Sequence, residues 1–323
     1  FPMFNTDIKM AVDIKSEARI KKIRKFLTYM RQYYVLYLFL ILPIAYFIIF
    51  KYVPMYGVLI AFKDYNMFDG IWRSPWNNFA TFKEIFGMKE FYRAVRNTLL
   101  LNSLDLIVGF PAPIILAIIL SELKNQSYKK VSQTILYLPH FLSWIVIGGL
   151  AIQLLSTQSG LVNILLEKLG IGPINFLTEK IPWLITYTIF GVWQSAGWNA
   201  IIYLAAIAGI NPELYEAAIV DGAGRLRRIW HITLPCIKST IIVLLILNVG
   251  RITQIGFDRP YAMGNYLVTD VSDVISTFVY RVGLRSGRFS TATAVGFFQS
   301  VVGMVFLLAA NYIADKVGEQ GIW

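Results

Sequence analysis

The sequence predicts an all-α integral membrane protein with six transmembrane helices. Three observations support this fold class: 56% of the 323 residues are hydrophobic, only 15% are charged, and six separate segments are apolar enough to cross a bilayer. The mean hydropathy is +0.57. A typical soluble chain has about 25% charged residues, so the composition excludes a pair of soluble domains.

Each predicted span follows from the length of its apolar run, because a bilayer core about 30 Å thick requires about 20 such residues in a helix. The first run, 33–50, is short but continuous, and its Pro43 is tolerable in a packed bundle. The second, 98–120, has Pro111 and Pro113 as expected kink sites. The other four spans are predicted at 135–155, 183–210, 239–257 and 291–314. A transmembrane domain therefore covers 33–323, and segment 1–32 precedes it.

Lys and Arg residues near the spans predict the orientation. Segment 1–32 has a dense basic block, which the positive-inside rule places in the cytoplasm. Six crossings return the carboxyl end to the same side, so both termini are predicted on the cytoplasmic face of the cell (inner) membrane. The connecting segments 121–134 and 211–238 are then cytoplasmic, and 51–97, 156–182 and 258–290 face outward. The four arginines in 258–290 are not favoured by this rule.

The net charge of +11 does not indicate nucleic-acid binding. The basic residues cluster between hydrophobic segments, where membrane proteins place their topology signals. Within the first of these clusters, residues 8–31 are predicted to form an amphipathic basic helix that lies on the membrane surface in contact with acidic lipids.

The motifs of common enzymes are absent from the sequence. There is no G-x-x-x-x-G-K-[ST] phosphate loop, so this chain is not expected to hydrolyse ATP by that route. There is also no H-E-x-x-H, no paired-cysteine metal site and no G-x-S-x-G elbow. His140 and His231 are too far apart to form a local ligand pair. We therefore expect no catalytic residue, no metal and no cofactor in this chain.

The most informative cytoplasmic segment is 211–235, NPELYEAAIVDGAGRLRRIWHITLP. Asn211 is a suitable N-cap and Pro212 suits the first helical position. Gly222 is expected to end this helix, because glycine readily adopts the left-handed conformation. A second short helix is predicted over 223–232, and Pro235 is expected to end it. The segment suits docking into a cleft on another protein, although an ordinary interfacial loop remains an alternative.

The run E-A-A-x-x-D-G-A, followed by I-T-L-P, resembles the EAA motif of binding-protein-dependent ABC importer permeases. The matching residues are Glu216, Ala217, Ala218, Asp221, Gly222, Ala223, Ile232, Thr233, Leu234 and Pro235. The stretches YLPHFLSW at 137–144, DVISTFVYRVGL at 273–284 and TATAVGFFQSVV at 291–302 are similar to the polysaccharide-permease subgroup of the type I carbohydrate-uptake importers. The similarity extends over nearly the whole chain.

This resemblance implies a type I ABC importer permease bundle in which 216–222 is a cytoplasmic coupling helix. It also implies several partners: a second, homologous permease subunit, two ABC ATPase subunits that hold ATP and Mg, and an extracytoplasmic solute-binding protein. Such a permease is not itself an enzyme. Segments 51–97 and 258–290 are the outward surface available to the binding protein, with a self-packed cap over the bundle as the alternative.

Polar side chains within the predicted spans indicate a substrate pathway, since they usually face a bundle interior or a water-filled cavity. Asn248, Arg251 and Gln254 are spaced by three residues, which predicts one helical face. The other candidates are Trp193, Trp198, Asn199 and Gln299. Aromatic rings and amide donors suit an oligosaccharide, which offers C–H faces and hydroxyls. Packing between helices is the alternative for all of them.

Arg251 bears on the chemistry of the cargo, because a guanidinium pairs bidentately with carboxylates. If it faces the cavity, the substrate is expected to be an acidic oligosaccharide that contains uronates, for example of the alginate type. Pairing with Asp105 inside the bundle is an equally good explanation.

The alternative function is an ion-coupled secondary transporter of sugars, which would need a proton or sodium site within the spans. Asp105 is the only obvious acid for such a site. A membrane enzyme or structural scaffold is a third class, but the sequence contains no assembled nucleophile or metal set.

Overall fold

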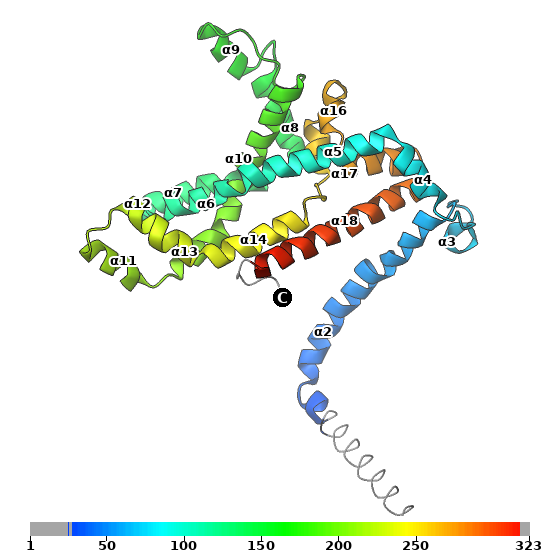
Figure 1. The fold of residues 1–323 in the computed structure, drawn as a ribbon, viewed down its shortest axis with the longest axis horizontal. Coiled ribbons are helices and arrows are strands. Elements are labelled where there is room, and N and C mark those ends of the chain that lie inside the picture. Colours follow the sequence, from blue (N-terminus) through cyan, green and yellow to red (C-terminus); the bar gives the residue numbers. More distant parts are fainter. Residues whose placement is uncertain (1–24, 26–27, 317–323) are drawn as a thin grey trace, which may run out of the picture. The chain divides into compact units, whose positions relative to one another are not determined.

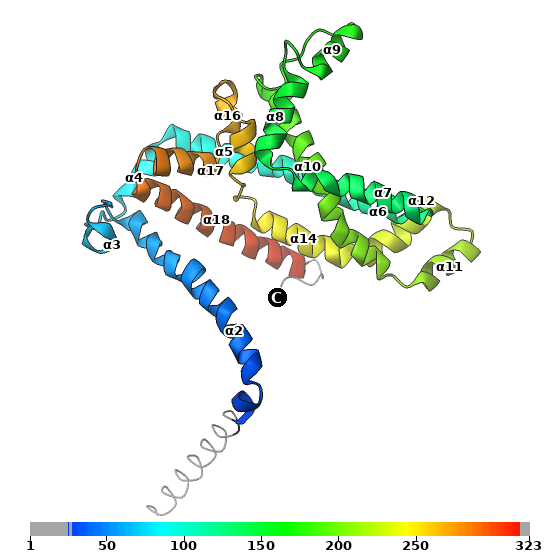
Figure 2. The same ribbon diagram turned by 180° about the vertical axis from the view of Figure 1, so that it is seen from behind.

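The computed structural model describes Lys25 and residues 28–316, so most of the predicted basic helix at 8–31 lies outside the described residues. The chain divides into two compact units, 1–59 and 60–323. The described residues are almost entirely helical and contain no strand beyond an isolated bridge between Lys63 and Trp76. Their arrangement is drawn in Figures 1 and 2.

The described residues of the first unit form mainly one helix, which continues a few residues into the second unit. The α-helix α2 (Tyr34–Phe47), the π-helical turn η1 (Ile48–Tyr52) and the 3-10 stretch η2 (Val53–Phe62) run on without a break, and together they form a span candidate of 29 residues, Tyr34–Phe62. No residue of α2 is buried, which suits a helix that is apolar all round and contacts lipid. The span is longer than the predicted 33–50 because apolar residues continue beyond Lys51.

The second predicted span lies in α5 (Lys89–Leu104), η3 (Asp105–Gly109) and α6 (Pro111–Ser121), which form one helix of 33 residues. In the π-helical turn η3, the Phe110 N–H donates to the carbonyl of Asp105. This widened turn comes directly before Pro111, which lacks an N–H to donate. The expected kink therefore takes the form of a local π turn.

The third predicted span, 135–155, is wrong as a single straight helix. Helix α7 (Gln126–Tyr137) and the 3-10 turn η4 (Leu138–Phe141) meet α8 (Trp144–Leu155) at an angle of 101°. The chain turns because Pro139 disrupts the helix and Ser143 caps a new one, its side chain accepting from the Val146 N–H at 3.3 Å.

The fourth predicted span coincides with α10 (Lys180–Ala208), which has 29 residues. This helix is long enough to cross a bilayer but is not among those apolar enough to count as span candidates. Polar residues near its middle, such as Gln194 and Asn199, lower its hydropathy.

The fifth predicted span, 239–257, ends early and the sixth, 291–314, is observed. Helix α14 (Lys238–Gly250) stops seven residues before the expected end, and α18 (Phe289–Lys316) covers the sixth. In the described part of the chain, three helices qualify as spans, and up to five if each bent pair counts as one. Six spans are therefore not confirmed.

Short helices complete the second unit. They are α3 (Gly70–Arg73), α4 (Ala80–Gly87), α9 (Leu161–Lys168), α15 (Asp258–Met263), η6 (Tyr266–Val268), α16 (Thr269–Ser272), α17 (Ile275–Val279) and η7 (Tyr280–Arg285). Within this unit, α6 packs against α10, α14 against α18, and α15 against α8. Both views show α14 and α18 side by side.

The contact between α8 and α15 requires a glycine. A Cβ added at Gly148 would lie 2.8 Å from the carbonyl oxygen of Ala262, whereas a Cβ at the adjacent Gly149 would meet nothing within 4 Å. We expect Gly148→Ala to lower the free energy of unfolding by about 1–3 kcal/mol, because the backbone of α15 must move. Gly149→Ala is the matched control and should change it by no more than about 0.5 kcal/mol. Thermal unfolding in detergent measures both, and equal midpoints for the two variants would contradict this packing.

Candidate functional site

A polar cavity of about 430 Å³ lies within the second unit. Its walls come from α5 with η3 and α6, from α10, from α14 and from the segment that follows α14. The polar lining residues are Asn102, Asp105, Ser195, Asn199, Tyr203, Asn248, Arg251, Gln254 and Arg259. A second recess of about 270 Å³ shares Asn102, Asp105 and Arg259 with it, so the two volumes adjoin.

Asn248, Arg251 and Gln254 all line this cavity, but they do not share one helical face as predicted. Helix α14 ends at Gly250, and Arg251 and Gln254 belong to the turn after it, where the Gln254 N–H donates to the Arg251 carbonyl at 2.7 Å. Because the helix stops at Gly250, the backbone carbonyls of the residues that follow need hydrogen-bond partners outside α14. The Asn102 amide supplies one of them by donating to the Ile252 carbonyl at 2.6 Å.

The pairing of Arg251 with Asp105 is also wrong, because Arg259 takes that place. Both terminal nitrogens of Arg259 donate to the Asp105 carboxylate, at 2.7 and 3.1 Å. The same guanidinium donates to the Tyr187 carbonyl at 2.7 Å and lies 3.7 Å from the centre of the Tyr187 ring. The Arg259 side chain is only 13% exposed, so burial and a bidentate partner fix its position. Arg251 is exposed and lines the cavity.

Sequence reasoning missed Arg259. The acid at position 105 did indicate that a basic partner was needed, but several arginines are available: Arg251 lies within the fifth predicted span, and Arg259, Arg281, Arg285 and Arg288 follow it. Only the fold selects among them. The sequence also does not show that residue 191 must be a glycine: a Cβ there would overlap a terminal nitrogen of Arg259.

Asn199 lines the cavity, but three other predicted pathway residues are not among its lining residues. Trp198 stacks on His140 with ring centres 4.6 Å apart, and Trp193 meets Phe190 edge to face. Gln299 donates to the Thr253 carbonyl and so joins α18 to the turn after α14. Trp198 and Gln299 thus join separate elements, whereas the Trp193 contact lies within α10 and its side chain is 46% exposed.

The segment after α10 forms the predicted helix, α11 (Pro212–Val220). The Asn211 side chain accepts from the Glu213 N–H at 3.0 Å, as an N-cap does. Gly222 has a φ of 73°, and the Ala223 N–H donates to the Ala218 carbonyl at 2.8 Å. This left-handed glycine and its hydrogen bond end the helix in the way that the sequence predicts.

The second short helix differs from the predicted 223–232. It starts at α12 (Arg225–Arg228) and continues through the π turn η5 (Ile229–Thr233) into α13 (Leu234–Cys236). Pro235 does not end it, because the widened turn before it has already shifted the hydrogen-bond register. The break comes at Ile237, where the chain bends by 61° into α14.

Helix α11 is exposed over most of its surface, with only Tyr215 and Ala218 half-buried. None of its residues is buried, and Val220 is 87% exposed. Its tie to the following helix is a hydrogen bond of 2.9 Å between the hydroxyls of Tyr215 and Thr233. It therefore presents the motif residues Glu216, Ala217, Ala218 and Asp221 at one end of the unit, as Figure 1 shows for the helix.

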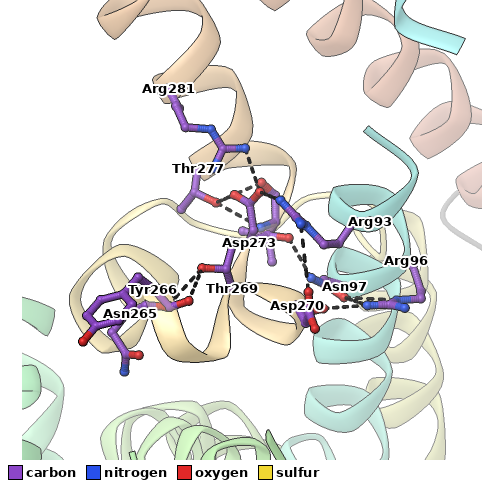
Figure 3. Close-up of polar contacts among 11 residues, drawn as sticks. Arg93, Arg96, Asn97, Asn265, Tyr266, Thr269, Asp270, Asp273, Thr277 and Arg281 are labelled. Carbon is purple, nitrogen blue, oxygen red and sulfur yellow. Dashed lines mark hydrogen bonds and ion pairs between the residues drawn. The ribbon is translucent and has the colours of Figure 1, made fainter. Parts of the chain in front are cut away.

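A polar cluster joins α5 to the segment between α15 and η7 (Figure 3). The Asp273 side chain is 4% exposed and pairs with Arg281 at 2.8 Å and Arg93 at 3.3 Å. Asn97 is fully buried and donates to the Asp273 carbonyl at 2.9 Å. This cluster fixes part of segment 258–290 on the end of α5.

Asp270 lies at the edge of the same cluster. A hydrogen bond and ion pair with Lys180 hold the pKa of its carboxyl below the ordinary value, with further lowering by the charges of Arg93 and Arg96. A lowered pKa means that the interaction stabilises the fold above the carboxyl's ordinary pKa and is lost as the pH falls through the lowered value.

No group of three His, Cys, Asp or Glu residues suited to a metal ion occurs between residues 28 and 316. The cavity offers amides, hydroxyls, one carboxylate and two guanidinium groups. Such a set can hydrogen-bond to the hydroxyls of a sugar and pair with a carboxylate.

We expect Gly191→Ala to displace Arg259 from Asp105, because the new methyl group occupies the guanidinium's place. Overpacking of this kind lowers the free energy of unfolding by about 1–3 kcal/mol. The control is Gly296→Ala, where a Cβ meets nothing within 4 Å. Thermal unfolding in detergent measures both; unchanged stability of the Gly191 variant would show that the pair tolerates a shift.

Comparison with known proteins gives consistent matches. The family described as "Binding-protein-dependent transport system inner membrane component" matches residues 91–319. Protein LplB of Bacillus subtilis is 47% identical over 288 residues, which are 89% of this chain and 91% of LplB. The polygalacturonan/rhamnogalacturonan transport system permease protein YteP of the same organism is 44% identical, over 97% of each chain.

A solved structure is similar over most of the chain as well. A chain of a bacterial ABC transporter involved in the import of the acidic polysaccharide alginate is 40% identical, with a TM-score of 0.84, over 91% of this chain and all of that chain. A second structure shows a bacterial alginate ABC transporter in complex with an alginate pentasaccharide-bound periplasmic protein, with a TM-score of 0.83, 40% identity, and coverage of 91% and 98%. These matches confirm the resemblance that the motif at 216–235 indicates.

Proposed function

Because this chain belongs to the family of binding-protein-dependent transport system inner membrane components, we propose that it is the membrane-spanning permease subunit of an ATP-driven ABC importer of oligosaccharides. The observation that carries the proposal is its 44% identity, along 97% of its length, to a permease named for polygalacturonan and rhamnogalacturonan transport. The polar cavity in the helical unit supports it.

The cargo is an acidic oligosaccharide that contains uronates. The similar solved transporter is described as importing the acidic polysaccharide alginate, and the permease named above is named for polygalacturonan and rhamnogalacturonan, whose galacturonate units carry carboxylates. In this chain, Arg251 is exposed at the cavity, and its neighbours Asn248, Gln254 and Asn199 are amides. A guanidinium binds the uronate carboxylate while amides bind the sugar hydroxyls. Direct contact of Trp193, Trp198 and Gln299 with the substrate stays a prediction.

Helix α11 is the coupling helix, which docks in a groove of a cytoplasmic ATPase subunit. The absence of any buried residue in α11 and the left-handed turn at Gly222 support this role. ATP and Mg belong to two partner ATPase subunits, and their closure moves α11 and switches the bundle between inward-facing and outward-facing states. Both termini lie in the cytoplasm in this arrangement.

Two further partners complete the importer. A second, homologous permease subunit provides the other half of the translocation pathway, and an extracytoplasmic solute-binding protein delivers the oligosaccharide to the outward segments 51–97 and 258–290. The structure of a similar transporter in complex with a periplasmic protein supports the latter.

The alternative, an ion-coupled secondary transporter, needs an acid that is available to bind a proton or sodium. Asp105 was the candidate, and its carboxylate is held by both terminal nitrogens of Arg259. An ion-paired carboxylate of this kind is a poor cation site, so the alternative is disfavoured.

Charge reversal on α11 tests the coupling role. In the assembled importer, we expect Glu216→Arg to reduce uptake and the ATPase stimulation by loaded binding protein more than tenfold, because a like charge or lost pair at an interface costs several kcal/mol. Glu167→Arg, on the exposed helix α9, is the matched control and should leave both unchanged. Coupled transport by the Glu216 variant would contradict the assignment.

Arg251→Gln tests the acidic cargo. We expect uptake of a uronate oligosaccharide to fall by about tenfold or more, since hydrogen bonds to charged groups contribute about 1.5–3 kcal/mol. Uptake of a neutral oligosaccharide should change little, and so should both activities in the control Lys168→Gln, an exposed cation on α9 that does not line the cavity. Competition uptake in proteoliposomes measures the ratio. An equal loss for acidic and neutral substrates would remove the argument for carboxylate recognition.

A further inference from the structure

A third recess, of about 670 Å³, lies apart from the polar cavity and shares no lining residue with it. It is formed by the first turns of α5, the start of α10 and the short helix α16. Its lining residues are Lys89, Tyr92, Arg93, Arg96, Leu100, Lys180, Asp270 and Val271. Four of them are cations and one is an acid, so the recess has a formal excess of positive charge.

The protein itself leaves this charge partly uncompensated. Arg93 pairs with Asp273, and Lys180 with Asp270 at 2.7 Å. Asp273 does not cancel the excess positive charge of the recess, because its one negative charge is also paired with Arg281. For Lys89 no hydrogen bond or ion pair is found among the described residues, so its ammonium group remains available to an external anion.

The recess lies at one end of a span candidate, where the chain is expected to leave the hydrocarbon core. Lys89 is the first residue of the continuous helix Lys89–Ser121, which is long and apolar enough to span a membrane. At 1.5 Å per residue this helix is about 50 Å long, so its first turns extend beyond a hydrocarbon core of about 30 Å. Leu100 lies inside the predicted span 98–120, and Arg96 lies just before it. This position holds for either orientation of the chain in the membrane.

One face of α5 changes along its length from charged to apolar. Lys89, Arg93, Arg96 and Leu100 follow one another at intervals of four, three and four residues, so they lie along one face of the helix. At 1.5 Å per residue the stripe is roughly 16 Å long. Leu100 is 37% exposed at its membrane end, and Tyr92 lies beside the cations, where interfacial tyrosines are common.

We propose that this recess binds the headgroup of an anionic phospholipid. Its phosphate lies among Lys89, Arg93 and Arg96, and the start of an acyl chain lies along Leu100. The recess has no amide or aliphatic hydroxyl in its lining, in contrast to the polar cavity, so it suits a phosphate with an apolar tail and not a sugar. Guanidinium and ammonium groups form charge-assisted hydrogen bonds to phosphate oxygens, which are strong in such a partly enclosed site.

The test counts lipids that stay bound to the purified full-length chain with its co-purifying subunits. Native mass spectrometry follows titration with phosphatidylglycerol or phosphatidylcholine. We expect retention of phosphatidylglycerol only. Lys89→Gln should weaken that binding about fivefold, the effect of one basic residue near an anionic lipid surface. Lys83→Gln is the matched control, since Lys83 is an exposed lysine on α4 outside the recess.

Three results would overturn the proposal: equal retention of the two lipids, equal losses in the two variants, or displacement of phosphatidylglycerol by millimolar glycerol phosphate or a soluble oligouronate. The last would assign the recess to a soluble anion. If the Lys89 variant does not fold, titration of the unmodified protein at high salt gives a second readout. Retention of phosphatidylglycerol must then fall, because salt screens exposed charges.

Discussion

The ion pair between Asp105 and Arg259 is the interaction on which the polar cavity depends. A charge within a membrane bundle is costly unless it is paired, and here one guanidinium satisfies the Asp105 carboxylate and the Tyr187 carbonyl together. The pair thereby joins three parts of the chain that are distant in sequence: η3, α10 and the start of α15. Gly191 gives the guanidinium the room it occupies. The spacing of these elements sets the width of the cavity.

Interrupted helices create the polar surface of that cavity. The π turn at Asp105 and the end of α14 at Gly250 both leave backbone groups outside regular helical bonding. A membrane permits this only where protein or water can satisfy those groups. The Asn102 amide does so by donating to the Ile252 carbonyl. The interruptions of the helices therefore place Arg251 and its neighbours in the wall of the cavity.

Helix α14 connects the cavity to the exposed helix α11. Its carboxyl end supplies Asn248 to the cavity, and its amino end meets the continuous helix Arg225–Cys236 at the buried residue Ile237. Tyr215 ties α11 to that same helix. Helix α11 and the cavity are thus connected by one continuous stretch of chain, residues 212–250, whose helices also contact one another. This stretch joins a surface that suits a partner protein to a cavity that suits a polar ligand. This arrangement agrees with membership of a family of transport permeases.

The sequence by itself determined the membrane class, the helical fold, the helix from Pro212 to Val220 and its end at Gly222, because apolar run length and local capping need only neighbouring residues. It also indicated which polar residues to consider for the cavity. Only the tertiary structure decided that Arg259 and not Arg251 pairs with Asp105, and that Trp198 packs on His140 instead of lining the cavity. It also placed the bends near Ser143 and Ile237. Those outcomes depend on how distant helices pack, and no spacing within one segment contains that information.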